Sequence, residues 1–306
     1  MFRRILASWL GSIARDEIPR RAAGAADDAP TDDTPEAGRD DSPGREAHGS
    51  TEREPCDVGF VFALGMEAGG LDDLISGATV LKGDGFVARR GSLAGRRVVS
   101  IVSGPGRQRA AKATEALIAG HRPRWIVSAG LAGGLVAELR HADVVYADRV
   151  CLVDGTAVDL PVDERLALWL GERKIARGAV LTVDRVVRRA EDKRQLGLRT
   201  TALVVDMETA AVVEVCRRRG VPARAFRAVV DTVDDELPPD VERLLEQPST
   251  AAKLGAALGT VWRRPGSARD LWNLQQRALV ASDALARALQ RWTRDWAGSA
   301  ERIPAN

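Results

Sequence analysis

Three acidic residues stand at or just after the ends of short apolar runs and are the first candidates for chemistry. These residues are Glu67, Glu208 and Asp231. Ligands bind at the carboxyl ends of strands in open α/β sheets. A carboxyl group placed there can exchange protons with a substrate. For any one of these acids, helix capping or a solvated loop end explains the position equally well. Their repetition favours a site, although it does not name the reaction.

The elements that would position these acids alternate between strand and helix. Apolar runs predict strands at 58–64, 86–90, 96–102, 125–128, 143–147, 179–183, 203–205 and 224–230. Helical spacing predicts helices at 110–120, 164–174, 190–196 and 209–218. Glycines between the second and third strands predict an antiparallel pair. We therefore expect an α/β fold with three layers, in which helices flank both faces of a central, mixed, twisted sheet.

Two segments rich in small residues adjoin the predicted strands. The turn at 103–107 (Ser-Gly-Pro-Gly-Arg) leads into a helix, so its backbone N–H groups could bind an anion or a hydroxyl group. A plain tight turn is the alternative. The turn lacks the lysine of a nucleoside triphosphate loop. The run at 129–135 (Ala-Gly-Leu-Ala-Gly-Gly-Leu) implies close approach of the backbone, to a ligand or to a neighbouring strand.

Composition excludes several classes of protein. The 306 residues carry a formal net charge of +2, and the arginines are scattered among acids, which argues against a nucleic-acid partner. Three widely spaced cysteines predict no disulfide framework and favour a reducing interior, so we expect a cytoplasmic protein. The three histidines, with no HxxxH or CxxC spacing, predict no metal site. We expect no cofactor.

The chain divides into three parts by composition. Residues 1–55 are predicted to form a disordered acidic leader rich in Pro, Gly and Ala. The first 14 are basic and then apolar, which leaves open a signal peptide, a helix that touches a partner or membrane surface, or a disordered start. Residues 56–248 form the predicted α/β domain. Residues 249–306 form a helical extension expected to pack on the core, with dimer or membrane contact as the alternative.

Five segments in order carry a resemblance to a known family. The segments are 62–67 (Phe-Ala-Leu-Gly-Met-Glu), 103–106, 129–135, 205–208 (Val-Asp-Met-Glu) and 227–231 (Arg-Ala-Val-Val-Asp). Together they resemble the nucleoside phosphorylase and nucleosidase superfamily, and most closely its methylthioadenosine/S-adenosylhomocysteine nucleosidases. The resemblance spans residues 58 to 235.

This resemblance implies separate roles for the candidate residues. Asp231 would protonate a purine leaving group, and Glu67 would activate water. Glu208 would accept hydrogen bonds from the ribose hydroxyls, with Met207 packed against the sugar. Breaking an N-glycosidic bond creates a cationic sugar and a poor leaving base, so separated carboxyl groups in different environments suit the reaction.

The remaining implied binding residues lie around these acids. Arg227 and Ser103 would help to hold the water, and Gly104 belongs to the same turn as Ser103. Val186 and Val187 would line the base pocket, where the family places an aromatic residue, so this pocket is aliphatic. The segment after Asp148 is shorter than in the nucleosidases, which bears on any contribution from a second subunit.

Three functions follow as hypotheses. The first is hydrolysis of a purine nucleoside, such as a 5′-substituted adenosine, in a homodimer. The second is phosphorolysis, since residues 183–208 also resemble hopanoid-associated phosphorylases; a hopanoid-linked substrate would suit weak contact with a membrane surface. The third is a non-catalytic nucleoside-binding protein. A carboxylate at Glu67 would repel phosphate and therefore favours water as the nucleophile. Arg107 and Arg109 beside the glycine turn could bind phosphate, so phosphorolysis stays an alternative.

Overall fold

The computed structural model describes residues 55–83, 86–162, 175–238, 241 and 265–296. The predicted leader up to residue 54, the predicted helix at 164–174 and the segment 249–264 lie outside the described residues. The division of the chain into leader, domain and extension therefore stays a prediction.

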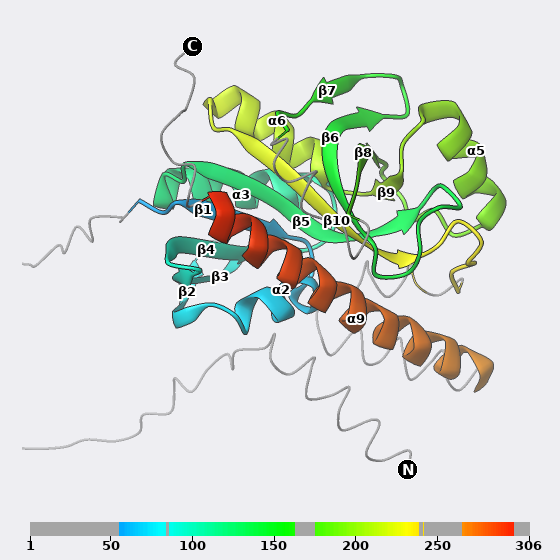
Figure 1. Cartoon of the computed structure of the whole chain (residues 1–306), viewed down its shortest axis with the longest axis horizontal. Helices are drawn as coiled ribbons and strands as arrows, with labels where there is room; N and C mark the ends of the chain where they lie inside the picture. The colour runs from blue at the N-terminus through cyan, green and yellow to red at the C-terminus, as the bar shows by residue number, and fades with distance from the viewer. Residues whose placement is uncertain (1–54, 84–85, 163–174, 239–240, 242–264, 297–306) are drawn as a thin grey trace, which may run out of the picture. The chain divides into compact units, whose positions relative to one another are not determined.

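The strands of the described residues form one mixed sheet (Figure 1). The strands are β1 (Val58–Phe62), β2 (Ser76–Gly83), β3 (Phe86–Leu93), β4 (Arg96–Val102), β5 (Trp125–Gly134), β6 (Val144–Leu152), β7 (Ala157–Asp159), β8 (Ile175–Thr182), β9 (Val204–Asp206) and β10 (Ala223–Asp231). Their order is β10-β6-β8-β9-β5-β1-β4-β3-β2, with β7 paired to β6. Because β10 also pairs with β5, the strands β5, β10, β6, β8 and β9 close into a ring.

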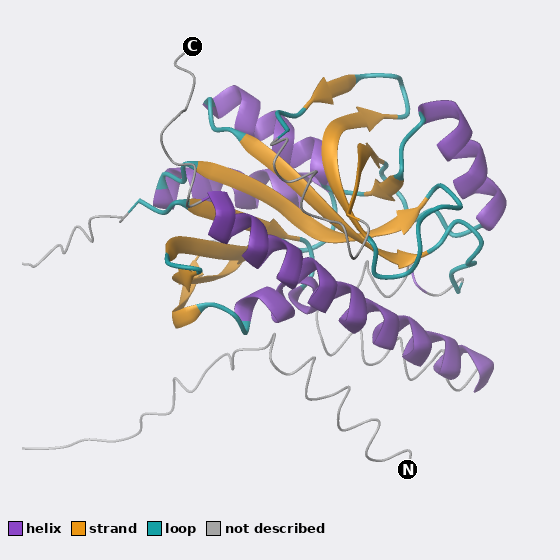
Figure 2. Ribbon diagram, viewed as in Figure 1, coloured by secondary structure: helices purple, strands orange, loops and turns teal. Residues whose placement is uncertain are grey.

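Helices cover both faces of this sheet (Figure 2). They are α2 (Gly65–Asp72), α3 (Arg107–His121), α5 (Ala190–Thr200), α6 (Thr209–Arg219) and α9 (Pro265–Trp296). Helices α3 and α6 pack against each other on one face, while α2 and α9 pack together on the other. The predicted three-layer α/β fold with a mixed central sheet is confirmed.

Each face of the sheet has its own apolar core. One core joins Leu117 of α3 and Val212 of α6 to the sheet. The other joins the strands to α9, where the ring centroids of Phe226 and Trp292 lie 6.0 Å apart. Leu285 of α9 is fully buried in this second core. Burial of α9 along one stripe thus makes this helix part of the fold.

Several elements differ from the sequence prediction. Strand β5 continues through the small-residue run to Gly134 instead of ending at Ser128. Strand β2 was not predicted, since its sequence lacks a continuous apolar run. Helix α2 begins at Gly65, so Glu67 lies in its first turn and not in a loop. The glycine-rich part of β5 pairs in parallel with β10 and, at Gly133 and Gly134, antiparallel with β9, and these strands supply the hydrogen bonds that the segment needs.

Two strands that lead to candidate residues run in opposite directions, as a mixed sheet allows. Strand β10 runs parallel to β5, whereas β9 runs antiparallel to it. Both nevertheless meet β5 at Gly133, which pairs with Val205 and with Asp231. The ends of β9 and β10, which lead to Glu208 and Asp231, therefore meet at one end of β5 from opposite directions.

Among the helices of the described residues, none combines the length and the apolar character that crossing a membrane requires.

Candidate active site

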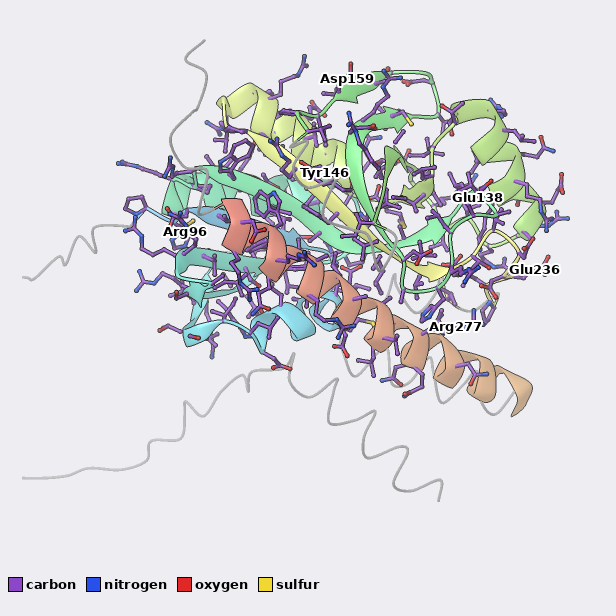
Figure 3. All side chains as sticks on the ribbon, viewed as in Figure 1. Arg96, Glu138, Tyr146, Asp159, Glu236 and Arg277 are labelled. Atoms are coloured by element: carbon purple, nitrogen blue, oxygen red, sulfur yellow. The ribbon has the colours of Figure 1, made fainter. Side chains whose placement is uncertain are left out.

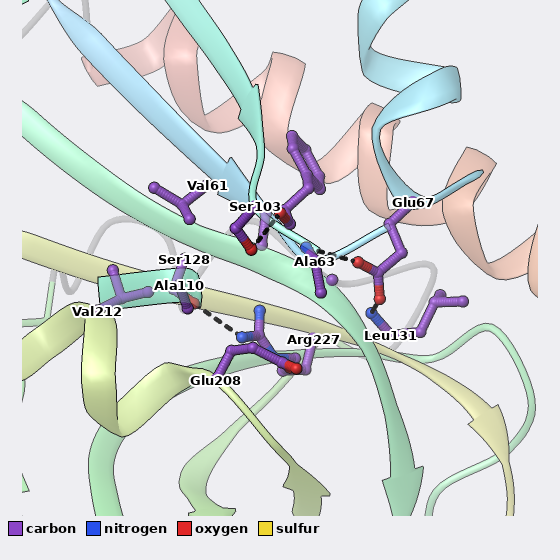
Figure 4. Close-up of a pocket in the computed structure, with 13 residues that line it drawn as sticks. Val61, Ala63, Glu67, Ser103, Ala110, Ser128, Leu131, Glu208, Val212 and Arg227 are labelled. Carbon is purple, nitrogen blue, oxygen red and sulfur yellow. Dashed lines mark hydrogen bonds between the residues drawn. The ribbon is translucent and has the colours of Figure 1, made fainter. Parts of the chain in front are cut away.

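A pocket lies where the ends of β1 and β4 and the middle of β5 meet the starts of α2, α3 and α6 (Figure 4). Its empty space is about 230 Å³, including the part open to solvent. The lining residues are Val61, Phe62, Ala63, Glu67, Ser103, Ala110, Ser128, Ala129, Gly130, Leu131, Glu208, Val212 and Arg227. The structure thus brings together four predicted site residues from distant parts of the sequence.

The carboxylate of Glu67 is held entirely by backbone N–H groups. Its Oε2 accepts from the N–H groups of Ala63 at 3.0 Å and Leu64 at 2.9 Å, and its Oε1 accepts from Leu131 at 2.9 Å. Burial raises the pKa of Glu67, and these backbone donors partly oppose the rise. A carboxylate fixed in this way is oriented for proton transfer, and no cation of the described residues pairs with it directly.

Glu208 faces the same pocket from the start of α6. Its Oε1 accepts a hydrogen bond of 2.7 Å from the N–H of Gly106, in the predicted glycine turn. Burial, and then the nearby charges of Asp206 and Glu67, raise the pKa of Glu208 to about 8. The glycine turn therefore binds a carboxyl oxygen through its backbone, and that carboxyl group belongs to the protein itself.

Arg227 lines the pocket, but its guanidinium is engaged by neighbours. Nε and Nη2 donate to Oδ2 of Asp206 at 2.8 and 2.6 Å. Nη2 also lies 2.8 Å from Oγ of Ser128 and 2.6 Å from Oγ1 of Thr209. Thr182 donates to the other oxygen of Asp206 at 2.7 Å. The positive charge of Arg227 is therefore largely neutralised within the wall.

Ser103 follows β4 and is buried beside Glu67. Its Oγ lies 3.1 Å from the carbonyl oxygen of Phe62 and 2.7 Å from that of Gly104, so its one proton is given to the backbone. The oxygen remains free to accept from a ligand. Gly104 has φ of +80° and packs against the side chain of Arg109 outside the lining.

Two glycines of β5 let the acidic side chains approach the strand. A Cβ on Gly130 would lie 3.1 Å from Oε1 of Glu67, and one on Gly133 would lie 3.1 Å from Oδ2 of Asp231. The predicted close approach of the backbone is thus to two carboxyl groups. Three residues of strand separate the two glycines by about 10 Å.

Asp231 ends β10 after a bulge that shifts its register by one residue. Bulges commonly re-aim side chains beside active sites. Asp231 is buried, and its Oδ2 accepts a hydrogen bond from the ammonium group of Lys193. Burial raises the pKa of Asp231, and the charge of Lys193 opposes that rise. Asp231 does not belong to the lining of the pocket.

Three further predicted residues also lie outside the lining. Val186 and Val187 follow β8, and Val187 packs with Leu135 and Leu181 in a small apolar cluster. Met207 is half-buried between β9 and α6. An aliphatic environment on this side agrees with the predicted aliphatic base pocket, whose contacts with a ligand stay a prediction.

Sequence reasoning missed two charged residues of the site, Asp206 as the partner of Arg227 and Lys193 as the partner of Asp231. A signal for Lys193 exists, because Ala190, Lys193 and Gly197 recur at helical spacing and form the buried side of α5. In the part of the chain that the structure describes, no group of His, Cys, Asp or Glu side chains is suited to hold a metal ion.

Comparisons with known proteins agree with this geometry. A family model described as the phosphorylase superfamily matches residues 57–260. A 5′-methylthioadenosine/S-adenosylhomocysteine nucleosidase of Actinobacillus succinogenes is 27% identical over 209 residues, which cover 61% of this chain and 91% of that protein.

Two solved structures share the fold. The nucleosidase of the same name from Neisseria meningitidis, in complex with methylthio-immucillin-A, gives a TM-score of 0.61 at 21% identity, covering 78% of this chain and 99% of that one. Futalosine hydrolase of Helicobacter pylori gives a TM-score of 0.57 at 18% identity, covering 79% of this chain and all (100%) of that one.

Proposed function

The chain belongs to the phosphorylase superfamily, and on this premise we propose that it hydrolyses the N-glycosidic bond of a purine nucleoside. The proposed substrate is a 5′-substituted adenosine, from which the enzyme releases adenine. The 27% identity to a 5′-methylthioadenosine/S-adenosylhomocysteine nucleosidase over most of that protein supports this substrate class.

The observation that carries hydrolysis is the charge of the pocket wall. Two carboxyl groups, Glu67 and Glu208, face the pocket, while the guanidinium of Arg227 is bound to Asp206. Within the described lining no other cation is present. A phosphate ion entering here would meet carboxyl oxygens without a free positive partner, whereas water can donate hydrogen bonds to those oxygens.

The proposed reaction uses the carboxyl groups at opposite ends of the substrate. The bond between C1′ of the sugar and the base breaks, and its electron pair goes to the base. Asp231 gives a proton to a ring nitrogen of the base, while water adds to C1′ and gives its proton to Glu67. Glu208 binds the ribose hydroxyls, with Met207 against the sugar.

The two acids contact different parts of β5. Glu67 and Asp231 touch β5 at Gly130 and Gly133, about 10 Å apart along the strand. We propose that the sugar of the nucleoside lies next to Glu67 and its base next to Asp231. Ser103 would accept a hydrogen bond from the water, and Gly104, Val186 and Val187 would border the ligand.

Phosphorolysis is the second candidate, and one observation favours it. The side chain of Arg109 lies against Gly104, where a Cβ would be 3.0 Å from its Nη1, so a cation stands beside the turn that borders the pocket. Arg107 is engaged with Asp184, with Nη1 and Oδ1 3.4 Å apart. A shift of Arg109 toward the turn would supply the charge that phosphate needs. The hopanoid-linked adenosine suggested by the sequence belongs to this second candidate.

Assembly and compartment form the remaining part of the proposal. We propose a homodimer in the cytoplasm, with weak contact to a membrane surface through the basic and apolar first residues. Cys56, Cys151 and Cys216 are buried and unpaired, as a reducing compartment allows. We also propose that the leader ends at residue 55 and that the extension begins at residue 249.

Release of adenine from a panel of adenosines, measured with and without phosphate, tests the function. The panel contains adenosine, 5′-methylthioadenosine, S-adenosylhomocysteine and an adenosine with a long apolar 5′ chain. We expect release without phosphate and a free sugar as the second product. A sugar 1-phosphate formed only with phosphate would replace the first candidate by the second, and no release from any member would reject both.

A further inference from the structure

Lys193 is the most deeply buried charged side chain near the proposed catalytic acid. It has no exposed surface, although lysine is almost never fully buried without a partner. Its neighbours Asp192 and Arg194 on α5 are exposed. Figure 1 shows α5 beside the end of β10, where this side chain meets the chain that follows Asp231.

The ammonium group of Lys193 has a partner for each of its protons. Nζ donates to Oδ2 of Asp231, to the carbonyl oxygen of Thr232 at 3.0 Å and to that of Asp235 at 2.8 Å. Only the protonated amine offers three donors. The segment from Asp231 to Asp235 is therefore folded around a positive charge.

The same segment is fixed from its other side. The carboxylate of Asp235 accepts from the N–H and the hydroxyl of Thr232, both at 2.8 Å. Arg277 of α9, labelled in Figure 3, then holds Asp235. Nη1 of Arg277 and Oδ1 of Asp235 lie 2.9 Å apart. Lys193, Asp235 and Arg277 are thus the charged groups that act on the carboxyl group of Asp231.

We infer that Lys193 is a positioning residue for proton donation by Asp231. It holds Oδ2, so that Oδ1 is left to carry the proton to the leaving base. When that proton has moved to the ring nitrogen of the base, the ammonium group stabilises the carboxylate that remains. Lys193 itself neither gains nor loses a proton. This inference rests on the proposed nucleosidase function.

A consequence for the pH profile separates this role from a structural one. Activity that needs protonated Asp231 falls as the pH rises through the pKa of that group. The charge of Lys193 keeps this pKa lower than burial alone would set it. Removing the charge should therefore move the alkaline limb of the profile to higher pH, while turnover falls.

The experiment compares the parent enzyme with Lys193→Met, Lys193→Arg and the control Arg194→Met, using 5′-methylthioadenosine. Arg194 is the exposed neighbour on α5 and pairs with Asp234 at 2.5 Å. We expect Lys193→Met to lower kcat by roughly 10- to 100-fold with little change in KM, and to move the alkaline limb upward by about one pH unit or more. Arg194→Met should match the parent.

Lys193→Arg keeps the positive charge but cannot reproduce the three tetrahedral donors of the ammonium group. We therefore expect a reduced kcat and an alkaline limb of the pH profile at the same pH as in the parent. A Lys193→Met enzyme whose kcat and whose alkaline limb in the pH profile both match those of the parent would overturn the inference. If the neutral variant does not fold, parental kcat in Lys193→Arg would overturn it instead. A parent that releases no base from the whole nucleoside panel would reject the proposed function, which is a separate outcome.

Discussion

Arg227 and Asp206 form an ion pair inside the wall of the pocket, with Nη2 and Oδ2 2.6 Å apart. Both side chains are buried, and Thr209 adds its backbone N–H and its hydroxyl to the same carboxylate oxygen. Removing one partner of a buried pair leaves an uncompensated charge. This pair therefore joins β10 to the end of β9, Thr209 links it to the start of α6, and the pair sets the electrostatics beside Glu208.

Arg227→Met should lower the free energy of unfolding by about 3–5 kcal/mol, because the Asp206 carboxylate would stay buried without its cation. Urea denaturation followed by circular dichroism measures the change. Arg149→Met is the matched control, since its pair with Asp159 is exposed, and its midpoint should stay close to that of the parent. Equal midpoints for both variants would show that the Asp206 pair is not a structural tie.

Gly130→Ala should reduce kcat by roughly 10- to 100-fold with the fold intact. The new methyl group would lie 3.1 Å from Oε1 of Glu67, and three backbone N–H groups keep that carboxylate from moving away. Steady-state release of adenine measures the effect.

The control for this variant is Gly69→Ala, on the same helix as Glu67. A Cβ at Gly69 has nothing within 4 Å, so activity should be unchanged, and stability should rise by about 0.5–1 kcal/mol from the better helix propensity. Full activity in Gly130→Ala would mean that the position of Glu67 is not critical.

The sequence was sufficient for the features that depend on local pattern. Continuous apolar runs predicted most strands, and the family resemblance predicted that Glu67, Ser103, Glu208 and Arg227 belong to one site. Their meeting in one pocket agrees with that prediction.

Local pattern was insufficient where pairing between residues far apart in the sequence decides the structure. The glycine-rich half of β5 is a strand because β10 and β9 flank it, and propensity alone argues against it.

The buried charges were missed for a related reason. Lys193 reads as one of several charges on a polar helix, and only the fold brings it to Asp231, 38 positions along the chain. Asp206 is adjacent to the Met207-Glu208 pair, and the sequence analysis assigned it no role. It nevertheless pairs with Arg227, which lies 21 positions further along the chain. Ion pairs of this kind have no spacing rule, so a single sequence does not indicate them.

Thermal stability should depend on pH through Glu208. Its pKa of about 8 in the folded protein exceeds the ordinary value of 4.5. The folded state therefore binds this proton more tightly than the unfolded state does. The contribution to stability is complete below pH 4.5 and is lost as the pH rises to about 8, at about 1.4 kcal/mol per unit of pKa difference.

Glu208→Gln does not titrate, so its Tm relative to the parent should increase steadily from pH 5 to pH 8. Scanning calorimetry at half-unit steps measures this difference. Glu214→Gln, an exposed change on the same helix, should keep a constant offset from the parent. A constant offset for Glu208→Gln as well would remove Glu208 as the source of the pH dependence.

Replacing Glu67 with Gln tests the nucleophile. The amide oxygen can still accept from the N–H groups of Ala63 and Leu64, but the amide nitrogen would then face the N–H of Leu131 and could not accept from it. The variant thus loses its basicity and one hydrogen bond. Hydrolysis should slow by about 10²-fold or more, which is the scale for losing a positioned base. Adenine should still bind to the variant, as measured by calorimetry.

The parent enzyme should need no phosphate and should yield a free sugar. If Glu67 were instead only a neighbour of a phosphate site, its neutralisation would relieve repulsion, and phosphate-dependent turnover would rise in Glu67→Gln. That result would reject the role of Glu67 as the base and favour phosphorolysis.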